Sequence, residues 1–158
     1  MIKIVLSDVD GVLTDGKMWI NSIGDSFKCL NYKDIDAVSL LRSKGIKFGV
    51  VTAEENHFTT TIKQKMHPDF FFSGCKDKYQ CILAIARKEE ISLDEICYVG
   101  DGKYDIEPIS KVGLGVCPND AIDEVKIIAD IVLKSKGGEG CLAEIYTMLS
   151  IEQKEGPI

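Results

Sequence analysis

The chain has 158 residues, of which 45% are hydrophobic and 28% are charged, and its net charge of -6 gives a pI of about 5.0. This length supports one domain with a hydrophobic core. The acidic balance argues against nucleic acid as a partner, because that affinity comes largely from lysine and arginine on phosphate. No apolar run approaches the roughly 18 residues of a membrane helix, so we expect no membrane partner.

The cysteines are scattered along the chain and form no Cys-x-x-Cys pair, so their spacing does not indicate a zinc site. No signal peptide precedes the first predicted strand, which begins at residue 2. We therefore expect a cytoplasmic protein whose cysteines are reduced and mostly buried. They are Cys29, Cys75, Cys81, Cys97, Cys117 and Cys141.

The first predicted strand, residues 2–6, is a short β-branched run of the kind that is buried on both faces of a sheet. It leads into Asp8-Val9-Asp10-Gly11. Alternate residues of an extended segment point the same way, so Asp8 and Asp10 should face one site. Two such carboxylates need a shared proton or a cation, and oxygen ligands favour Mg²⁺. The alternative is an ordinary polar loop after a strand.

A β-hairpin is predicted over residues 17–30, where an Asn- and Gly-containing turn separates two short runs. Met18, Trp19, Ile20 and Phe27 make it more apolar than an exposed flap should be. This favours an oligomer interface. The alternative is that the hairpin folds down on its own domain.

Helices and strands alternate through the rest of the chain. We predict a helix over 35–43 capped by Asp34, and further helices over 54–65, 76–88, 105–111, 120–125 and 139–149. The predicted strands cover 46–51, 69–72, 96–99, 114–116 and 131–133. The fold class is therefore α/β: a Rossmann-like parallel sheet with helices on both faces and a β-hairpin inserted after the first strand. Residues 1–150 form the single domain and 151–158 a tail.

Polar residues end several of these strands, and the carboxyl ends of parallel strands are where such folds bind ligands. Besides the two aspartates, they are Thr52 and Asp101. The Thr52 hydroxyl, with free backbone N–H groups around Ala53 at a helix start, suits a phosphate oxygen. Threonine also caps helices, so this signal alone is weak.

Residues 8–15, Asp-Val-Asp-Gly-Val-Leu-Thr-Asp, resemble the first motif of the haloacid-dehalogenase-like phosphatases, D-x-D-G-x-x-T/V. The resemblance implies that Asp8 attacks phosphorus and that Asp10 acts as general acid and then base. A sugar alkoxide is a poor leaving group and needs that proton, and a carboxylate nucleophile splits hydrolysis into two steps. Thr52 is similar to the second motif.

The third motif of this family is a lysine near a helix start, which Lys78 resembles, with Lys76 as a competing candidate. The motif lysine would offset the phosphate charge and orient the nucleophile. The alternative is a lysine on the solvent-exposed side of a helix. The proposed arrangement can be tested only by the mutual geometry of lysine and nucleophile.

Residues 100–105, Gly-Asp-Gly-Lys-Tyr-Asp, resemble the fourth motif, G-D-x-x-x-D. The resemblance implies that Asp101 completes the Mg²⁺ site with Asp8 and the backbone carbonyl of Asp10, while Asp105 holds Lys78 or the loop. Many relatives carry Asp where Gly102 stands. The alternative is an acidic turn with a helix cap.

No large cap domain is visible, so the chain resembles the capless phosphatases of 2-keto-3-deoxy sugar acids. These are typically tetramers that pack their hairpins together, and a neighbour's C-terminal segment helps close each site. Here that segment would be residues 137–140, with Glu139; the alternative is a plain helix start with Glu in its first turn. Two rival functions are a phosphomutase, which usually needs a cap, and a non-catalytic sugar-phosphate-binding or assembly module.

The relatives divide into phosphatases of eight-carbon and nine-carbon sugar acids. The eight-carbon group, which acts on 3-deoxy-manno-octulosonate 8-phosphate, usually shows T-G-R and G-G-R-G, and this chain has Glu54 and Glu139 at those arginine positions. Arginine would suit the substrate carboxylate. Glu54 and Lys65 are eleven residues apart, about three helical turns, so Lys65 on the same face could replace it. We therefore favour a nonulosonate 9-phosphate, with the octulosonate ester as the alternative.

Overall fold

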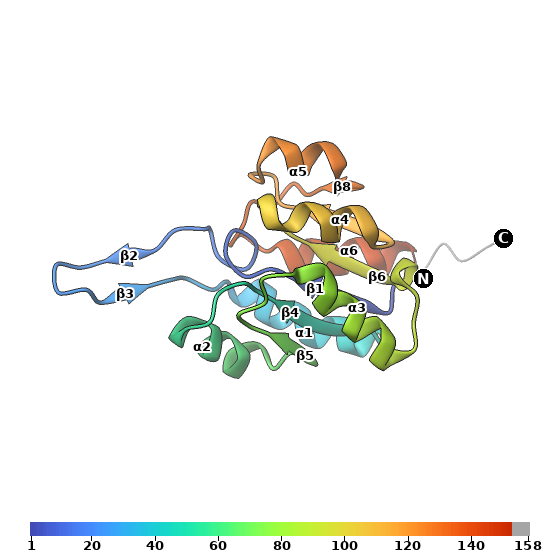
Figure 1. Cartoon of the computed structure of the whole chain (residues 1–158), viewed down its shortest axis with the longest axis horizontal. Coiled ribbons are helices and arrows are strands. Elements are labelled where there is room, and N and C mark those ends of the chain that lie inside the picture. The colour runs from blue at the N-terminus through green and yellow to red at the C-terminus, as the bar shows by residue number, and fades with distance from the viewer. Residues whose placement is uncertain (153–158) are drawn as a thin grey trace.

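A parallel six-stranded sheet forms the centre of the computed structural model, which describes residues 1–152 (Figure 1). The strand order is β5-β4-β1-β6-β7-β8, and every neighbouring pair is parallel. This confirms the predicted fold class. The strands are β1 (Ile4–Ser7), β4 (Lys47–Val51), β5 (Phe70–Phe72), β6 (Ile96–Val99), β7 (Leu114–Cys117) and β8 (Ile131–Val132).

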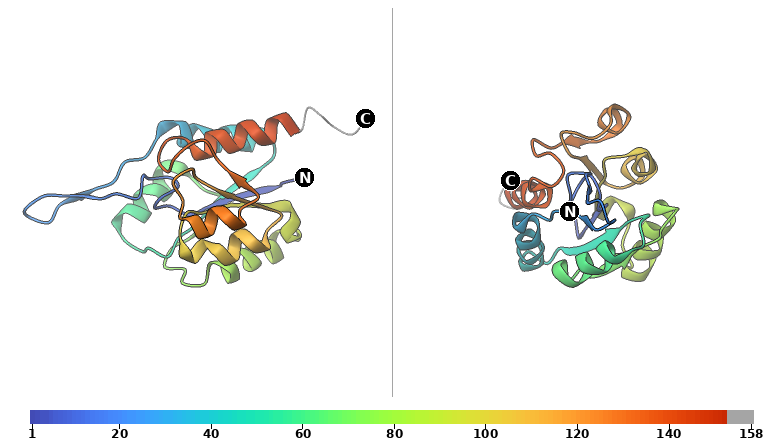
Figure 2. Two further views of the ribbon diagram at one scale, coloured as in Figure 1. Left: turned by 90° about the horizontal axis from the view of Figure 1, so that it is seen from above. Right: turned by 90° about the vertical axis from the view of Figure 1, so that its left-hand side faces the viewer.

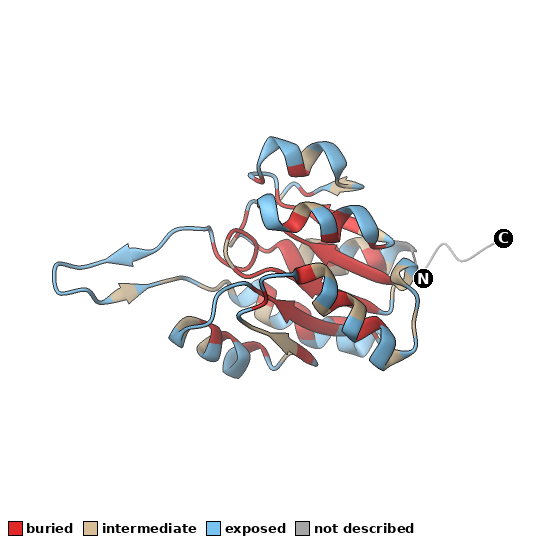
Figure 3. Ribbon diagram, in the orientation of Figure 1, coloured by how far each residue is buried: buried red, intermediate tan, exposed pale blue. Residues whose placement is uncertain are grey.

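Helices cover both faces of this sheet (Figure 2). They are α1 (Tyr32–Ser43), α2 (His57–Met66), α3 (Lys78–Glu89), α4 (Ile106–Lys111), α5 (Asp123–Ile128) and α6 (Cys141–Glu152), with short 3₁₀ turns η1 (Leu93–Glu95) and η2 (Lys103–Asp105). Val5 packs in an apolar cluster with α1, α2 and α6, whereas its neighbour Leu6 packs with α3, α4 and α5. Alternation along β1 thus contributes to both cores, and the central strands β1, β4 and β6 are largely buried (Figure 3).

The register of the sheet brings distant parts of the sequence to one edge. Ser7, the last residue of β1, is aligned with Val50 of β4 and Val99 of β6. The segments that follow these strands therefore leave the sheet side by side, and they carry Asp8, Thr52 and Asp101.

Three predicted helix starts are corrected by the structure, two of them through local capping. Asn31, not Asp34, caps α1 by accepting from the Lys33 N–H at 2.9 Å. Asn56 and Thr59 form a capping box, so α2 begins at His57 and Glu54 lies in the preceding loop. The last helix begins at Cys141, so Glu139 is not in its first turn.

The buried Asp34 instead joins two helices. Its position lies within α1, and its Oδ1 accepts a hydrogen bond from the Leu142 N–H at the start of α6 at 2.8 Å, while its buried Oδ2 has no hydrogen-bond partner among residues 1–152. Burial raises the pKa of Asp34 to about 6, although hydrogen bonds from the α6 backbone oppose this.

The hairpin of β2 (Trp19–Ile20) and β3 (Ser26–Phe27) projects from the body of the molecule (Figure 1). Its apolar side chains are exposed, and Trp19 is 72% exposed. The alternative that it folds down on its own domain is therefore wrong. At the other end, α6 continues to Glu152, two residues into the predicted tail, and the rest of that tail lies outside the described residues.

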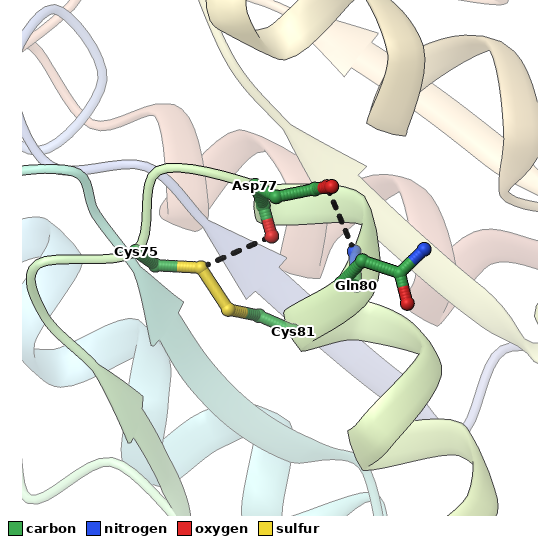
Figure 4. Close-up of a disulfide and its surroundings, with 4 residues drawn as sticks. All are labelled: Cys75, Asp77, Gln80 and Cys81. Carbon is green, nitrogen blue, oxygen red and sulfur yellow. Dashed lines mark hydrogen bonds between the residues drawn. A yellow bond between two sulfur atoms is a disulfide. The ribbon is translucent and has the colours of Figure 1, made fainter.

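Two cysteines depart from the expectation of reduced thiols. Cys75, in the loop before α3, and Cys81, one turn into α3, form a disulfide (Figure 4). Spacing in the sequence gave no sign of this pairing, because the helix start folds Cys81 back toward the loop. Cys97, Cys117 and Cys141 are buried as expected, and Cys29 is exposed. Within residues 1–152, no helix is long and apolar enough to cross a membrane.

Candidate active site

A pocket of about 220 Å³ opens at the carboxyl ends of the central strands. The described residues that line it are Asp8, Asp10, Thr52, Ala53, Glu54, Lys78, Asp101, Gly102, Tyr104 and Asp105. The structure therefore brings together the residues of all four motifs. Lys65, in the last turn of α2, and Glu139 are exposed, and neither is among the described residues that line the pocket.

Asp8 follows β1 and lies almost buried at the floor of the site. Its Oδ1 accepts from the Val9 N–H at 2.7 Å, and its Oδ2 lies 3.0 Å from Lys78 Nζ. Burial, followed by the negative charge of Asp105, raises the pKa of Asp8 to about 8, and Lys78 only partly opposes this. Without a further cation, this carboxyl group holds a proton more readily than an ordinary aspartate.

Lys78 is the first residue of α3, and the local structure fixes it there. Asp77 caps the helix by accepting from the Gln80 N–H at 3.1 Å, and the disulfide ties the preceding loop to the same turn (Figure 4). The Lys78 side chain is buried, whereas Lys76 is exposed, so the structure places Lys78 beside the nucleophile candidate. Burial alone would lower the pKa of Lys78, but the charges of Asp8 and Asp105 raise it.

Asp105 receives four hydrogen bonds. Its Oδ1 accepts from Lys78 Nζ at 2.7 Å and from the Tyr98 hydroxyl at 2.5 Å, and its Oδ2 accepts from the N–H groups of Asp101 and Gly102, both at 3.0 Å. The backbone of Gly100 passes so close that a Cβ there would lie 2.3 Å from Asp105 Cγ. Asp105 thus holds both the lysine and the loop, the two options that the fourth motif left open.

Tyr98 was missed from the sequence. It lies inside the core strand β6 and is fully buried. Burial, and then the charge of Asp105, raises its pKa well above the usual value, so its hydroxyl remains a donor. The available signal was a tyrosine in a buried strand, because a buried hydroxyl needs a hydrogen-bond partner.

The oxygen atoms of Asp8, Asp101 and Asp105 can lie within 4.8 Å of one another. Burial, and then the charge of Asp105, raises the pKa of Asp101 to about 6. Asp105 is occupied by its four donors, so Asp8 and Asp101 are the carboxylates of this group better placed to bind a cation. One lysine does not neutralise three carboxylates, so the donor set fits a hard divalent cation such as Mg²⁺.

Gly11 brings the first-motif loop against this cluster. A Cβ at Gly11 would lie 1.9 Å from Asp101 Oδ2, and its φ of +85° is a left-handed conformation that favours glycine. The glycine therefore permits the close approach between the loop that carries Asp10 and the carboxylate of Asp101.

Asp10 is held from two sides. Its Oδ1 accepts from the Thr14 hydroxyl at 3.1 Å, and Lys28 Nζ lies 3.0 Å from Oδ1 and 2.9 Å from Oδ2. Lys28 comes from the base of the hairpin and was not anticipated, since nothing in its sequence position points to a residue 18 positions earlier.

The phosphate-side residues lie in the loop between β4 and α2. Thr52 is buried, and its hydroxyl oxygen accepts from the Glu54 N–H at 3.2 Å. The Glu54 carboxylate accepts from Asn56 Nδ2 at 3.2 Å. Because Glu54 precedes α2, the predicted helical alignment of Glu54 with Lys65 is wrong.

Residues 137–140 pack against the first-motif loop of the same chain. The Gly138 N–H donates to the Val12 carbonyl at 2.9 Å, and a Cβ at Gly137 would lie 2.1 Å from the Gly11 carbonyl oxygen. This segment therefore supports the first-motif loop, which carries Asp8 and Asp10, of its own chain. Whether Glu139 also reaches a neighbouring subunit's site stays a prediction.

The chain is similar to known proteins in sequence and in fold. Residues 54–145 match the family described as haloacid dehalogenase-like hydrolase. A 3-deoxy-D-manno-octulosonate 8-phosphate phosphatase from Haemophilus influenzae is 26% identical over 148 residues, covering 94% of this chain and 82% of that protein.

Solved structures show the same fold. The cobalt-bound deoxy-D-mannose-octulosonate 8-phosphate phosphatase from Haemophilus influenzae has a TM-score of 0.90 and 26% identity, covering 98% of this chain and 90% of that one. The Moraxella catarrhalis 3-deoxy-D-manno-octulosonate 8-phosphate phosphatase, in complex with magnesium, phosphate and the sugar acid, has a TM-score of 0.91 at 23% identity, covering 98% and 88%.

Proposed function

Because the chain belongs to the haloacid dehalogenase-like hydrolases, we propose that it is a Mg²⁺-dependent phosphomonoesterase that acts on a 2-keto-3-deoxy sugar acid phosphate. The observation that carries the proposal is the contact of Lys78 Nζ with Asp8 Oδ2 at 3.0 Å, in a pocket that Asp10 and Asp101 also line. A paired nucleophile, a second carboxylate and a cation site are what hydrolysis through an aspartyl-phosphate requires.

The residues divide the chemistry between them. An Asp8 oxygen forms a bond to phosphorus as the ester P–O bond breaks, and Asp10 gives its proton to the departing alkoxide oxygen. Water then attacks the aspartyl-phosphate, Asp10 takes the proton of that water, and Asp8 is released with inorganic phosphate. Asp8, Asp101 and the backbone carbonyl of Asp10 would hold Mg²⁺, which would supply charge neutralisation for the phosphoryl oxygens when bound.

Lys78 and the residues around Thr52 hold the phosphate. The ammonium group offsets phosphate charge and keeps Asp8 oriented, because it is itself fixed by Asp105. The Thr52 hydroxyl and the Ala53 N–H are at the pocket wall, where they can donate to a phosphoryl oxygen.

The test is phosphate release with Mg²⁺ by Asp8→Asn and Asp10→Asn proteins, with Lys76→Met, a change at an exposed lysine in the loop before α3, as the control. We expect Asp8→Asn to abolish turnover and Lys76→Met to leave it unchanged. Turnover of Asp8→Asn at the wild-type rate would refute the mechanism. Absence of turnover by the wild-type protein across a panel of sugar phosphates would favour the non-catalytic binding module.

For the substrate, the relatives give better support to 3-deoxy-manno-octulosonate 8-phosphate, which we propose first. One observation favours the nine-carbon ester: Glu54 lines the pocket at a position where the eight-carbon group usually has arginine. An ionised glutamate repels a substrate carboxylate but accepts hydrogen bonds from sugar hydroxyls.

The comparison of kcat/KM for the two esters tests this choice. We expect a higher kcat/KM for the octulosonate ester. A higher kcat/KM for the nonulosonate ester would make the nine-carbon ester the preferred substrate instead. In the second case, Glu54→Arg should lower kcat/KM for the nine-carbon ester more than for a generic phosphate ester.

We further propose that residues 1–150 act as one phosphatase domain whose hairpin, residues 17–30, assembles the chain into a homotetramer. The exposed apolar side chains of the hairpin support this, because contiguous exposed apolar surface marks interaction sites. A cytoplasmic location stays a prediction.

A further inference from the structure

We infer that Lys28 is a positioning residue for Asp10, and that the base of the hairpin thereby helps set the acid–base carboxylate of the site. The inference rests on the role of Asp10 in the proposed function. Its starting point is the contact of Lys28 Nζ with both carboxylate oxygens of Asp10, at 3.0 and 2.9 Å.

The environment of this pair differs from that of a surface ion pair. The Lys28 side chain is only 14% exposed, whereas Lys47, which pairs with Glu89 at the surface, is 51% exposed. The Asp10 side chain is 31% exposed, compared with 18% for Glu89, so the shielding concerns the ammonium end of the pair. An ammonium shielded from water is held in a more definite geometry than an exposed one.

Lys28 is also held on its other side. Its ammonium lies 5.0 Å from the centre of the Phe58 ring, in the first turn of α2. This distance is typical of a cation–π contact. The ring and the Asp10 carboxylate therefore fix the ammonium between α2 and the first-motif loop.

Lys28 acts through Asp10 rather than on the substrate. Among the described residues, Asp10 lines the pocket and Lys28 does not. Thr14 donates to the same carboxylate, so Asp10 is oriented by a hydroxyl from its own loop and an ammonium from the hairpin.

This arrangement fixes the direction in which the Asp10 carboxyl group points. The Thr14 hydroxyl and the Lys28 ammonium hold it from two sides, so that it faces the pocket in which the departing alkoxide oxygen takes its proton. An ester whose leaving group departs without a proton gains little from this alignment in the step that breaks the ester bond.

The test compares two esters in the presence of Mg²⁺. One is the sugar acid phosphate, which releases an alkoxide, and the other is p-nitrophenyl phosphate, which releases a stable phenolate. The variants are Lys28→Met, Lys28→Arg and Asp10→Asn, with Lys17→Met as a control for loss of an exposed hairpin lysine.

We expect Lys28→Met to lower the rate of leaving-group release in a single turnover about tenfold or more for the sugar ester and by no more than about threefold for p-nitrophenyl phosphate, because the later attack of water is common to both esters and does not enter this rate. The ester concentration that gives half the maximal rate should be nearly unchanged. Lys28→Arg should restore most of the rate for the sugar ester, and Lys17→Met should resemble the wild type. Asp10→Asn should show the same selective loss, in stronger form.

An equal loss on both esters, or no loss on the sugar ester, would overturn the inference. If Lys28→Met does not fold, Lys28→Gln replaces it, and failure of both to fold would show a structural role and overturn the inference as well. If Asp10→Asn loses activity equally on both esters, the acid role in the proposed function fails. If Asp10→Asn is selective and Lys28→Met is not, only the inference about Lys28 fails.

Discussion

Replacing Asp105 with asparagine should destabilise the protein strongly, although the two side chains have the same shape. Asp105 accepts four hydrogen bonds while buried, and an amide can present only one oxygen to the two pairs of donors. If its NH₂ group replaces Oδ2, it faces the N–H groups of Asp101 and Gly102. If it replaces Oδ1, it faces Lys78 and the Tyr98 hydroxyl.

Either orientation leaves at least one buried donor without an acceptor, at a cost of about 1–3 kcal/mol for each such group. Removing one partner of a buried ion pair typically costs about 3–5 kcal/mol, but Lys78 keeps Asp8 as a second partner. We therefore expect Asp105→Asn to lower the free energy of unfolding by about 3 kcal/mol and, at about 2–4 °C per kcal/mol for a chain of this size, to lower Tm by about 6–12 °C.

Urea unfolding followed by far-ultraviolet circular dichroism, with a chelator to remove divalent cations, measures this loss. Tyr98→Phe serves as the matched variant, since it removes one donor and leaves the carboxylate paired, and it should cost about 1 kcal/mol. The double variant should cost less than the sum of the two single variants because they share a contact. A loss below about 1 kcal/mol for Asp105→Asn, or strict additivity with Tyr98→Phe, would refute the reasoning.

Three further outcomes can be measured. The pKa of Asp34 is raised to about 6, so its stabilising contribution is present below about pH 4 and is lost as the pH rises to about 6. The unfolding free energy of Asp34→Asn minus that of the wild type should therefore rise by about 2–3 kcal/mol between pH 4 and pH 7. A difference that stays constant over this range would contradict the reasoning. Gly11→Ala should raise the Mg²⁺ concentration for half-maximal activity about tenfold or more by displacing Asp101, whereas Gly24→Ala, which shares a positive φ but meets no atom within 4 Å, should not. Light scattering should show an oligomer for the wild type and a smaller species for Trp19→Lys, and a monomeric wild type would remove the proposed tetramer.

The sheet and the main site could be predicted from the sequence because both depend on a short-range pattern. An apolar β-branched run followed by a polar residue indicates a buried strand and its carboxyl end, and parallel pairing then gathers Asp8, Thr52 and Asp101. The motif spacing added Lys78 and Asp105, which the structure places in contact.

What the sequence did not reveal depends on details of the folded chain. The capping box at Asn56 moves the start of α2 from the predicted residue 54 to His57 and removes Glu54 from the helix on which the substrate argument relied. The contact of Lys28 with Asp10 depends on the path of the hairpin, and the disulfide between Cys75 and Cys81 depends on the start of α3. None of these is encoded in a repeating pattern of residue types.

The exposed position of Trp19 has an optical consequence. Trp19 is the only tryptophan in the chain, and its exposed indole lies at the start of the hairpin strand β2, outside the core. In the free chain its emission maximum should already lie at the long wavelength of a hydrated indole, so unfolding of the sheet would leave the emission wavelength almost unchanged. An apolar surface that covers the hairpin would instead shift the emission maximum to shorter wavelength. Intrinsic fluorescence therefore reports binding at the hairpin and not unfolding of the core.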